Sequence, residues 1–281
     1  MTQSAVSHAI KALEEDLSSR LVDRVGKRIQ LTASGKQLLV HAENILREMQ
    51  AARAGIQTAT ASDGGRIRVG AGTTACQYLL PSVIREFQSG YPTCTIALEP
   101  GGQSRLFELL SGGHVDLALV LSPASAVLDD LILVPLFEDE LRLLVSPQHP
   151  WARLGGGPGP ELEKGTLILC GRKGHCHGLV ADYFRQEKAS MGAVIELGSV
   201  DAVKEMAKLG VGAAVLPPWT AGSELASGSL VSIPLGKRRL RRHWNVAYWK
   251  GRRLTRTQQA FVGLCDASAK LLEASAVAAV G

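Results

Sequence analysis

The sequence has no long apolar run and no even set of cysteines. No stretch approaches the roughly 18 consecutive apolar residues of a membrane-spanning helix. The start of the chain also shows no basic segment followed by an apolar one, so we expect a cytoplasmic protein. The five cysteines are irregularly spaced and do not form a disulfide framework; they are Cys76, Cys94, Cys170, Cys176 and Cys265.

The sequence also lacks the short motifs of common enzyme classes. It contains no Gly-x-Ser-x-Gly elbow, no His-Glu-x-x-His pair and no dinucleotide-binding fingerprint. The glycine-rich residues 155–160 lack the Gly-Lys-Ser/Thr ending of a phosphate loop, so nucleotide hydrolysis is not indicated. His114, His149 and His243 are isolated and are interpreted as surface or core residues. We therefore expect neither catalysis nor a cofactor.

What is present is the composition of a soluble globular protein. The 281 residues are 46% apolar and 20% charged, and they suffice for two or three folding units. The net charge of +5 permits contact with nucleic acid without proving it. Residues 237–256 hold nine Lys and Arg residues and no acidic residue. We interpret this run as a solvated surface; the alternative is a site for an anion or a partner.

Residues 2–17 predict an amphipathic helix. Its apolar residues follow one another at steps of four, three and four, which places them on one stripe; they are Val6, Ile10, Leu13 and Leu17. The opposite face carries amide, hydroxyl and cationic side chains that can hydrogen-bond to base edges in a major groove of double-stranded DNA. These side chains belong to Gln3, Ser4, Ser7, His8 and Lys11.

Residues 20–31 predict a basic β-hairpin after this helix. Two short β-like runs flank a turn at Gly26, and Arg24, Lys27 and Arg28 are available to contact the DNA backbone. A helix followed by a basic hairpin is typical of a recognition helix with a wing. The alternative is an ordinary amphipathic helix and hairpin with solvated charges.

A longer stretch resembles a known family, the LysR-type transcriptional regulators. The segment is TQSAVSHAIKALEEDLSSRLVDRVGKRIQLTASGKQLL, and the family usually shows T-Q-P/S-A-V-S, I-x-x-L-E, L-F-x-R and L-T-x-A-G. Val22 stands where Phe is common. Family members carry about two further helices before this point, and these helices bury the apolar face of the recognition helix. We therefore expect either a start codon upstream of Met1 or a truncated product with impaired DNA binding.

Residues 33–60 predict one long helix with a heptad seam. The seam consists of Leu38, Ala42, Ile45, Met49, Ala52, Ile56 and Ala59. Because a single helix cannot bury such a stripe, we expect it to pair with another subunit in a homodimer or homotetramer. The alternative is that the helix packs against the rest of its own chain, residues 63–281. Residues 62–65 then predict a hinge.

From residue 66 onward, strands alternate with helices, which predicts an α/β fold with two lobes. The first set has strands at residues 66–70, 94–99 and 115–120 and helices at 78–89 and 104–110. The second set has strands at 166–169, 193–197 and 212–217 and helices at 180–186 and 200–209. Ligands of open α/β sheets bind outside the carboxyl ends of the strands. This rule selects residues 72–74, 101–104, 170–177 and 199–201.

This half of the chain also resembles the LysR family, in its effector-binding domain. The matching segments are RIRVGAGTTACQYLLP, IALEPGGQSRLFELLSGGHVDLALV, PLFEDELRLLVSPQHPWA and GSVDAVKEMAKLGVGAAVLP. The resemblance implies the fold of type II periplasmic binding proteins, with two lobes joined by two crossing strands. We expect a partial winged helix-turn-helix at residues 1–32, a linker helix at 33–62 and an effector domain at 63–281. Lobe I would span about 66–142 and 238–275, and lobe II about 143–237.

The resemblance also implies positions that contact a small-molecule effector. By matching position these are Thr74 and Ser104, with Thr73 and Gln103 beside them. Hydroxyls and helix N-terminal N–H groups favour a small organic anion; the alternative role of these hydroxyls is helix N-capping. The strand-end rule adds Cys170, His175 and Ser199 from the other lobe.

Residues 170–177 gather two thiols and two imidazoles, which suggests three interpretations. Thiolate and imidazole ligands suit zinc or copper. Arg172 and Lys173 would repel a cation, however, and the spacing is not that of a zinc finger, so we predict no metal site. The other two interpretations are anion binding by Arg172, Lys173 and His175, and a plain loop.

Together these observations predict a LysR-type regulator of transcription. A co-effector bound between the lobes would change their relative angle and thereby the spacing of the DNA-binding pairs. An alternative is a truncated cytoplasmic protein that binds a small molecule and oligomerises without binding DNA. A stand-alone solute-binding protein would share the two-lobed fold, but the hairpin and the linker helix argue against it.

Overall fold

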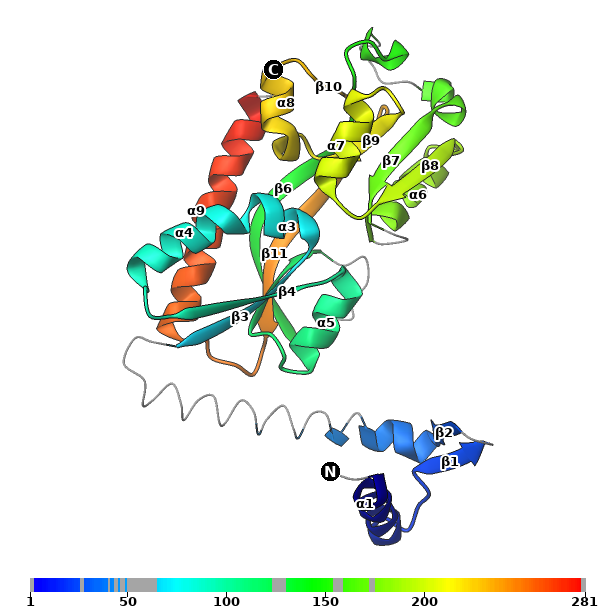
Figure 1. Cartoon of the computed structure of the whole chain (residues 1–281), viewed down its shortest axis with the longest axis vertical. Helices are drawn as coiled ribbons and strands as arrows, with labels where there is room; N and C mark the ends of the chain where they lie inside the picture. The colour runs from blue at the N-terminus through cyan, green and yellow to red at the C-terminus, as the bar shows by residue number, and fades with distance from the viewer. Residues whose placement is uncertain are drawn as a thin grey trace. The chain divides into compact units, whose positions relative to one another are not determined.

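A computed structural model of the chain describes residues 3–25, 28–39, 41, 42, 45, 49, 65–122, 130–153, 159–171 and 175–278 (Figure 1). The chain divides into two compact units, Met1–Thr60 and Ala61–Gly281. Within the described ranges, every helix is too short or too polar to cross a lipid bilayer.

The first unit begins with the predicted helix and hairpin. Helix α1 spans Gln3–Asp16, and strands β1 (Val22–Val25) and β2 (Arg28–Leu31) pair antiparallel, with Val22 opposite Leu31. The apolar stripe of α1 is partly exposed, since Val6 and Leu13 each retain 42% of their accessible surface.

Side-chain contacts to the backbone connect α1 to the hairpin and explain part of the sequence motif. The Glu14 carboxylate accepts a hydrogen bond from the Leu21 N–H at 2.7 Å, and this bond lowers the pKa of Glu14 below its ordinary value. The Thr32 hydroxyl donates to the Arg20 carbonyl oxygen at 2.7 Å and accepts from the Gly35 N–H at 2.9 Å. A Cβ atom at Gly35 would lie 2.0 Å from the Leu21 carbonyl oxygen, so only glycine fits there.

A helix follows the hairpin, as predicted, and the structure describes it at residues 33–39, 41, 42, 45 and 49. Large apolar side chains along it are exposed within this unit, which agrees with an unpaired seam; they are Leu39, Ile45 and Met49. The remaining seam positions Ala52, Ile56 and Ala59 lie outside the described residues. Pairing through this helix therefore stays a prediction.

The first lobe of the second unit is a parallel sheet with helices between its strands. Strands β3 (Arg66–Ala71), β4 (Thr95–Pro100) and β5 (Leu117–Leu121) lie in the order β4-β3-β5. Helices α3 (Thr73–Tyr78) and α4 (Leu80–Gly90) connect β3 to β4, and α5 (Gln103–Ser111) connects β4 to β5.

The second lobe repeats this arrangement. Strands β7 (Thr166–Cys170), β8 (Ala193–Leu197) and β9 (Ala213–Leu216) form a parallel set with β7 in the middle. Helix α6 (His175–Gln186) connects β7 to β8, and α7 (Val200–Lys208) connects β8 to β9. The 3-10 helices η1 (Pro150–Arg153) and η2 (Gly159–Lys164) precede β7, whereas η3 (Pro218–Ala221), α8 (Gly222–Ala226) and β10 (Val231–Ile233) follow β9.

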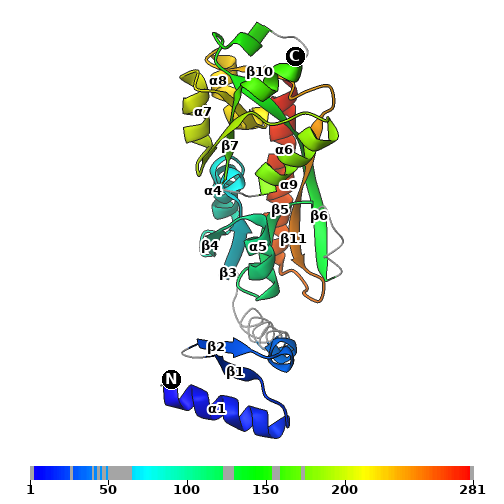
Figure 2. The same cartoon turned by 90° about the vertical axis from the view of Figure 1, so that its right-hand side faces the viewer.

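Two long strands join the lobes, as the family resemblance implies. Strands β6 (Leu131–Val145) and β11 (Leu240–Trp249) pair antiparallel and run through both lobes (Figure 1 and Figure 2). β11 continues the first lobe's sheet through β5, and β6 continues the second lobe's sheet through β9. The terminal helix α9 (Arg256–Ala278) packs on the first lobe. There the ring of Phe261 meets the ring of Phe87 of α4 edge-on, with the ring centres 5.4 Å apart.

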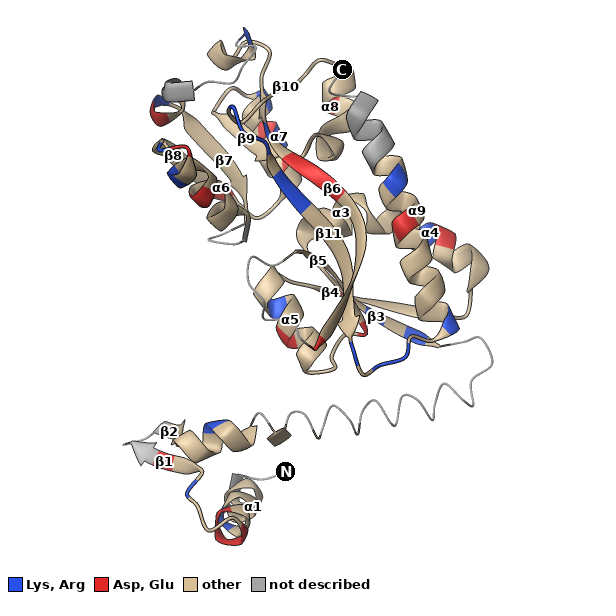
Figure 3. Cartoon of the chain, turned by 180° about the vertical axis from the view of Figure 1, so that it is seen from behind, with Lys and Arg blue, Asp and Glu red and all other residues tan. Residues whose placement is uncertain are grey.

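Part of the basic run at residues 237–256 pairs with acidic residues and does not stand free in solvent. Its β11 part lies against an acidic part of β6, with Arg242 opposite Asp139 in the strand register (Figure 3). Arg241 pairs with Glu138 at 2.9 Å, and Arg239 lies 3.8 Å from Glu140. Three of the nine cations in the run, Arg239, Arg241 and Arg242, are therefore paired with acidic residues of β6.

The structure differs from the predicted elements at three places. A short helix, α3, was not predicted, because the small polar residues after Gly72 resemble a loop. The strand predicted at residues 115–120 begins at Leu117, since Asp116 turns to the Arg68 side chain and accepts a hydrogen bond at 2.8 Å. Helix α6 begins at His175, so the plain-loop interpretation of residues 170–177 is wrong for its last part.

Candidate functional site

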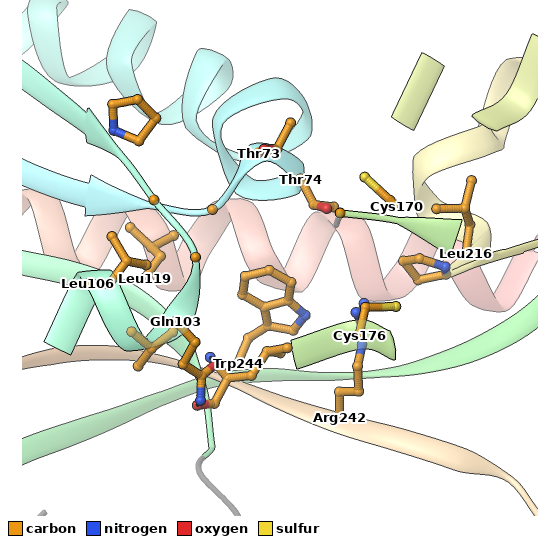
Figure 4. Close-up of a pocket in the computed structure, with 18 of the residues that line it drawn as sticks. Thr73, Thr74, Gln103, Leu106, Leu119, Cys170, Cys176, Leu216, Arg242 and Trp244 are labelled. Atoms are coloured by element: carbon orange, nitrogen blue, oxygen red, sulfur yellow. Dashed lines mark hydrogen bonds between the residues drawn. The ribbon is translucent and has the colours of Figure 1, made fainter. Parts of the chain in front are cut away.

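A cavity of about 500 Å³ lies between the two lobes (Figure 4). The first lobe contributes the segments that follow β3 and β4, and the second lobe contributes the ends of β7, β8 and β9. The crossing strands supply Leu141, Arg242 and Trp244. The cavity therefore occupies the strand-end position that the sequence predicts for a ligand.

Several helices begin at this cavity. Gly72 and Gly102 occupy the N-cap positions of α3 and α5 with extended backbone, and neither helix has a side-chain cap. Cys176 in the first turn of α6 and Gly198 just before α7 also line the cavity. Because helix N-termini carry partial positive charge and free N–H groups, this convergence favours an anionic group.

Predicted effector residues from both lobes come together here. Thr73, Thr74 and Gln103 line the cavity from the first lobe, and Cys170 lines it from the second. The Gln103 side chain is already engaged, since its amide donates to the Leu121 carbonyl oxygen at 2.9 Å and accepts from the Leu121 N–H at 3.3 Å. Gln103 therefore shapes the wall by fixing the end of β5.

Other predicted positions lie near the cavity without lining it. Ser104 is exposed and follows Gln103 on α5, where the helical rotation turns it away from the direction of its neighbour. Ser199 is the N-cap of α7, but Gly198 takes the lining position and the Ser199 side chain makes no cap hydrogen bond. The side chain of His175, with Arg172 and Lys173, lies outside the described residues.

Arg242 is a cavity residue that the sequence reasoning missed. It is 8% exposed, and its Nε donates to Asp139 Oδ1 at 2.7 Å while its Nη2 donates to Asp139 Oδ2. Burial would lower the pKa of Arg242, but the charge and hydrogen bonds of Asp139 raise it above its ordinary value. The signal in the sequence was indirect: residues 138–140 are acidic and residues 237–242 are mostly basic, and only the pairing of β6 with β11 brings them together.

Asp139 is the centre of a buried cluster, defined by Asp139, Trp219, Arg242 and Trp244. Besides Arg242, it accepts hydrogen bonds from the indole N–H groups of Trp219 at 3.0 Å and Trp244 at 2.9 Å. The Phe137 ring stacks parallel to the Trp244 ring, with their centres 5.8 Å apart, and meets the Trp219 ring edge-on, with their centres 5.7 Å apart. Because Trp219 comes from η3 and the others from the crossing strands, this cluster fixes the junction of the lobes.

A second polar cluster bridges the lobes, and we call it the edge cluster: Tyr78, Asp201, Lys204 and Glu224. The Tyr78 hydroxyl on α3 donates to Asp201 at the start of α7 at 2.6 Å. The Lys204 Nζ lies 3.3 Å from Asp201 Oδ1 and 2.8 Å from Glu224 Oε1. The same nitrogen lies 5.2 Å from the centre of the Tyr78 ring. Burial, followed by the hydrogen bond to Asp201, raises the pKa of Tyr78 to about 12.

The two cysteines at the cavity are in an environment that favours the thiol. Burial raises the pKa of Cys170 to about 11 and raises that of Cys176, although the positive charge of Arg242 opposes both shifts. His177, next to Cys176, instead contacts Glu196 of β8. Among the described residues, no group of three or more His, Cys, Asp or Glu side chains could hold a metal ion.

The predicted DNA-reading face lies on α1 of the first unit. Ser4, Ser7, His8 and Lys11 are exposed, and Lys11 lies 3.8 Å from Glu15 on the next turn. The remaining predicted contacts have side chains outside the described part of the chain; they are Gln3, Arg24, Lys27 and Arg28.

Comparison with known proteins assigns the family. Residues 60–270 match the LysR substrate binding domain, and residues 1–36 match the bacterial regulatory helix-turn-helix protein of the lysR family. The chain belongs to the LysR family of transcriptional regulators. This confirms the predicted family, the fold class, and the combination of a DNA-binding region with an effector-binding domain.

Relatives of this LysR regulator include two proteins named as transcriptional regulators and one solved regulatory domain. The transcriptional regulator CfxR of Cupriavidus necator is 31% identical over 256 residues, which cover 91% of this chain and 80% of CfxR. A probable RuBisCO transcriptional regulator of Synechocystis is 30% identical over 266 residues, covering 93% and 77% of the two chains. The regulatory domain of Synechocystis CcmR in complex with 2-PG superposes on this chain with a TM-score of 0.65 at 26% sequence identity. The superposition covers 73% of this chain and 98% of the CcmR domain.

Proposed function

We propose that this LysR regulator senses a small organic anion in the interlobe cavity and transmits its binding to operator DNA. The observation that carries the proposal is the cavity itself, whose walls come from both lobes and both crossing strands. A ligand that touches both lobes can favour one lobe arrangement over another. That differential affinity is what a change of conformation requires.

The chemistry of the cavity supports an anion. Helices begin on several sides of it, and Arg242 contributes a cationic side chain. The volume of about 500 Å³ lies within the usual range of small-molecule sites. The 2-PG complex of the CcmR domain gives a related example of a small ligand bound to this fold.

We assign three roles to the predicted effector-site residues. Thr73, Thr74 and Cys170 would contact the ligand directly, since they line the cavity. Ser104, His175 and Ser199 would act from the starts of their helices, and Gln103 would hold the wall. The proposed domain limits remain 1–32, 33–62 and 63–281, with lobes at about 66–142 with 238–275, and 143–237.

On the DNA side, α1 would read base edges and the hairpin would contact phosphates. The proposed base-reading residues are Gln3, Ser4, Ser7, His8 and Lys11, and the proposed phosphate contacts are Arg24, Lys27 and Arg28. Two copies joined through residues 33–60 would meet the two halves of a double-stranded operator. We further propose a cytoplasmic protein without catalytic activity, because its relatives are named as transcriptional regulators.

Thermal unfolding of the full chain tests the sensing role. We expect at least one anion from a panel of glycolate, phosphoglycolate, shikimate and phosphate to raise the melting temperature. Thr74→Ala should shrink that shift, because a lost hydrogen bond to a charged ligand costs up to about 3 kcal/mol. Ser89→Ala, at an exposed position of α4 outside the cavity lining, is the control and should keep the full shift. A lost helix cap would instead lower the melting temperature without any ligand.

The same anion should change operator affinity, measured at one fixed salt concentration. If it stabilises the chain but leaves DNA binding untouched over its whole titration, the cavity is not a regulatory site.

A further inference from the structure

Arg242 has donor capacity that the protein does not use. Its guanidinium carries five N–H donors, and Asp139 engages the Nε and Nη2 positions. Among the described residues, none accepts a hydrogen bond from Nη1. The side chain is 8% exposed and lines the cavity (Figure 4), so the donors that Asp139 leaves unused are buried with it.

A buried guanidinium with unused donors calls for an acceptor. Leaving a buried donor unsatisfied costs about 1–3 kcal/mol, and more when the group is charged. Of the described residues that line the cavity, Arg242 is the one with a charged side chain. The neighbouring lining groups, Cys176 and Trp244, are weak acceptors or none at all. The natural acceptor is therefore an oxygen of the bound molecule.

We propose that Arg242 binds the charged group of the effector through Nη1, and that Asp139 is the positioning residue that orients it. This inference rests on the proposed function and names the group of the ligand that is read: a carboxylate or a phosphate. Asp139 holds the Nε and Nη2 edge, while the indole N–H groups of Trp219 and Trp244 donate to its Oδ2 and fix the carboxylate in turn. The guanidinium is thus fixed before the ligand arrives.

The orientation by Asp139 also predicts selectivity. Asp139 offsets the long-range field of Arg242, so recognition depends on a short charge-assisted hydrogen bond, which an ionised oxygen accepts more strongly than a neutral one. A carboxylate should bind better than the amide of the same shape. A residue with a purely structural role would lower the affinity for both by the same factor.

The test compares glycolate with glycolamide, and inorganic phosphate with both, by isothermal titration of the full chain. In wild type we expect glycolate or phosphate to bind on the order of 10- to 100-fold more tightly than glycolamide. Arg242→Gln should abolish this preference, and Arg242→Lys should restore part of it by returning a cation. Whichever of the two anions binds more tightly decides between carboxylate and phosphate.

The neighbouring Arg241→Gln is the control. Arg241 is half-exposed and pairs with Glu138. The Arg241→Gln variant should therefore keep the preference for glycolate over glycolamide within about 2-fold of wild type. Equal losses for glycolate and glycolamide in Arg242→Gln would overturn the inference, as would an unchanged preference. If Arg242→Gln unfolds, Arg242→Lys must still reduce the preference for the inference to stand. Failure of glycolate and phosphate to bind wild type would overturn this inference, whereas failure of the entire anion panel would overturn the proposed ligand class.

Discussion

The two polar clusters that connect the lobes differ most in the exposure of their aspartates. In the buried cluster, Asp139 and Arg242 are 7% and 8% exposed, and aromatic rings surround them. In the edge cluster, the Asp201 side chain is 62% exposed. A charge that is buried has no water to replace a lost partner, whereas an exposed one is resolvated at little cost. The buried cluster is therefore suited to a fixed junction, and the edge cluster to a contact that opens and closes.

Removing the charge of Asp139 should have the largest effect. Asp139→Asn keeps the shape of the side chain but leaves the buried Arg242 cation without its counter-charge. We expect a loss of about 3–5 kcal/mol in the free energy of unfolding, measured by urea denaturation. Glu138→Gln on the same strand is the matched control, and it should cost below about 1 kcal/mol. Equal losses in the two variants would show that burial does not make the Asp139–Arg242 pair more costly to break than an exposed pair.

Lys204 should show an intermediate effect, because it is the most buried member of the edge cluster. It is 7% exposed, and Lys204→Met would remove its pairs with Glu224 and Asp201. We expect a loss of about 1–3 kcal/mol, again by urea denaturation. Lys208→Met, which breaks the helical pair with Glu205, provides the comparison and should change stability by about 0.5 kcal/mol or less. A loss as large as that of Asp139→Asn would place Lys204 with the fixed junction.

Tyr78→Phe should have a smaller effect on stability. It removes the hydroxyl that donates to Asp201, while the ring keeps its edge contact with Trp219 at 6.1 Å. We expect the free energy of unfolding to fall by about 1 kcal/mol or less. Amide hydrogen exchange in residues 198–204 should nevertheless become faster in the ligand-free chain, because the interlobe contact is weakened. Unchanged exchange there would show that the hydroxyl does not hold the lobes together.

The smallest effect concerns the titration of Asp201. The hydrogen bond from Tyr78, with a further contribution from Lys204, lowers the pKa of Asp201 below its ordinary value of 3.8. Because the pKa of Asp201 is lower in the folded state than in the unfolded chain, its ionised carboxylate stabilises the fold fully at a pH above the unfolded-state pKa. This stabilisation is lost as the pH falls through the lowered, folded-state pKa. The edge cluster should therefore remain intact at pH 5 to 7. In Tyr78→Phe, the pKa of Asp201 followed by carbon NMR should rise; an identical pKa would contradict the assignment.

Sequence reasoning located the cavity walls that follow directly from local patterns. Thr73, Thr74 and Cys170 were found because strand ends and glycine-rich turns are visible along the chain. Arg242 was missed because nothing local distinguishes it from the neighbouring cations; only the register of β6 against β11 places Asp139 beside it. The start of α6 was missed because His, Cys and Gly are weak helix formers. The edge cluster depends on contacts between distant segments, such as Tyr78 with Asp201, and no short pattern encodes it.

Hydrogen exchange of the full chain with and without its best-binding anion tests the central claim most directly. A ligand held by both lobes should slow exchange together in residues 72–79 of the first lobe and residues 198–204 of the second. Thr74→Ala should reduce the protection of both segments at equal anion concentration. If the anion slows exchange in only one lobe, or only outside these two segments, the proposal that the effector binds both lobes and holds them together is contradicted.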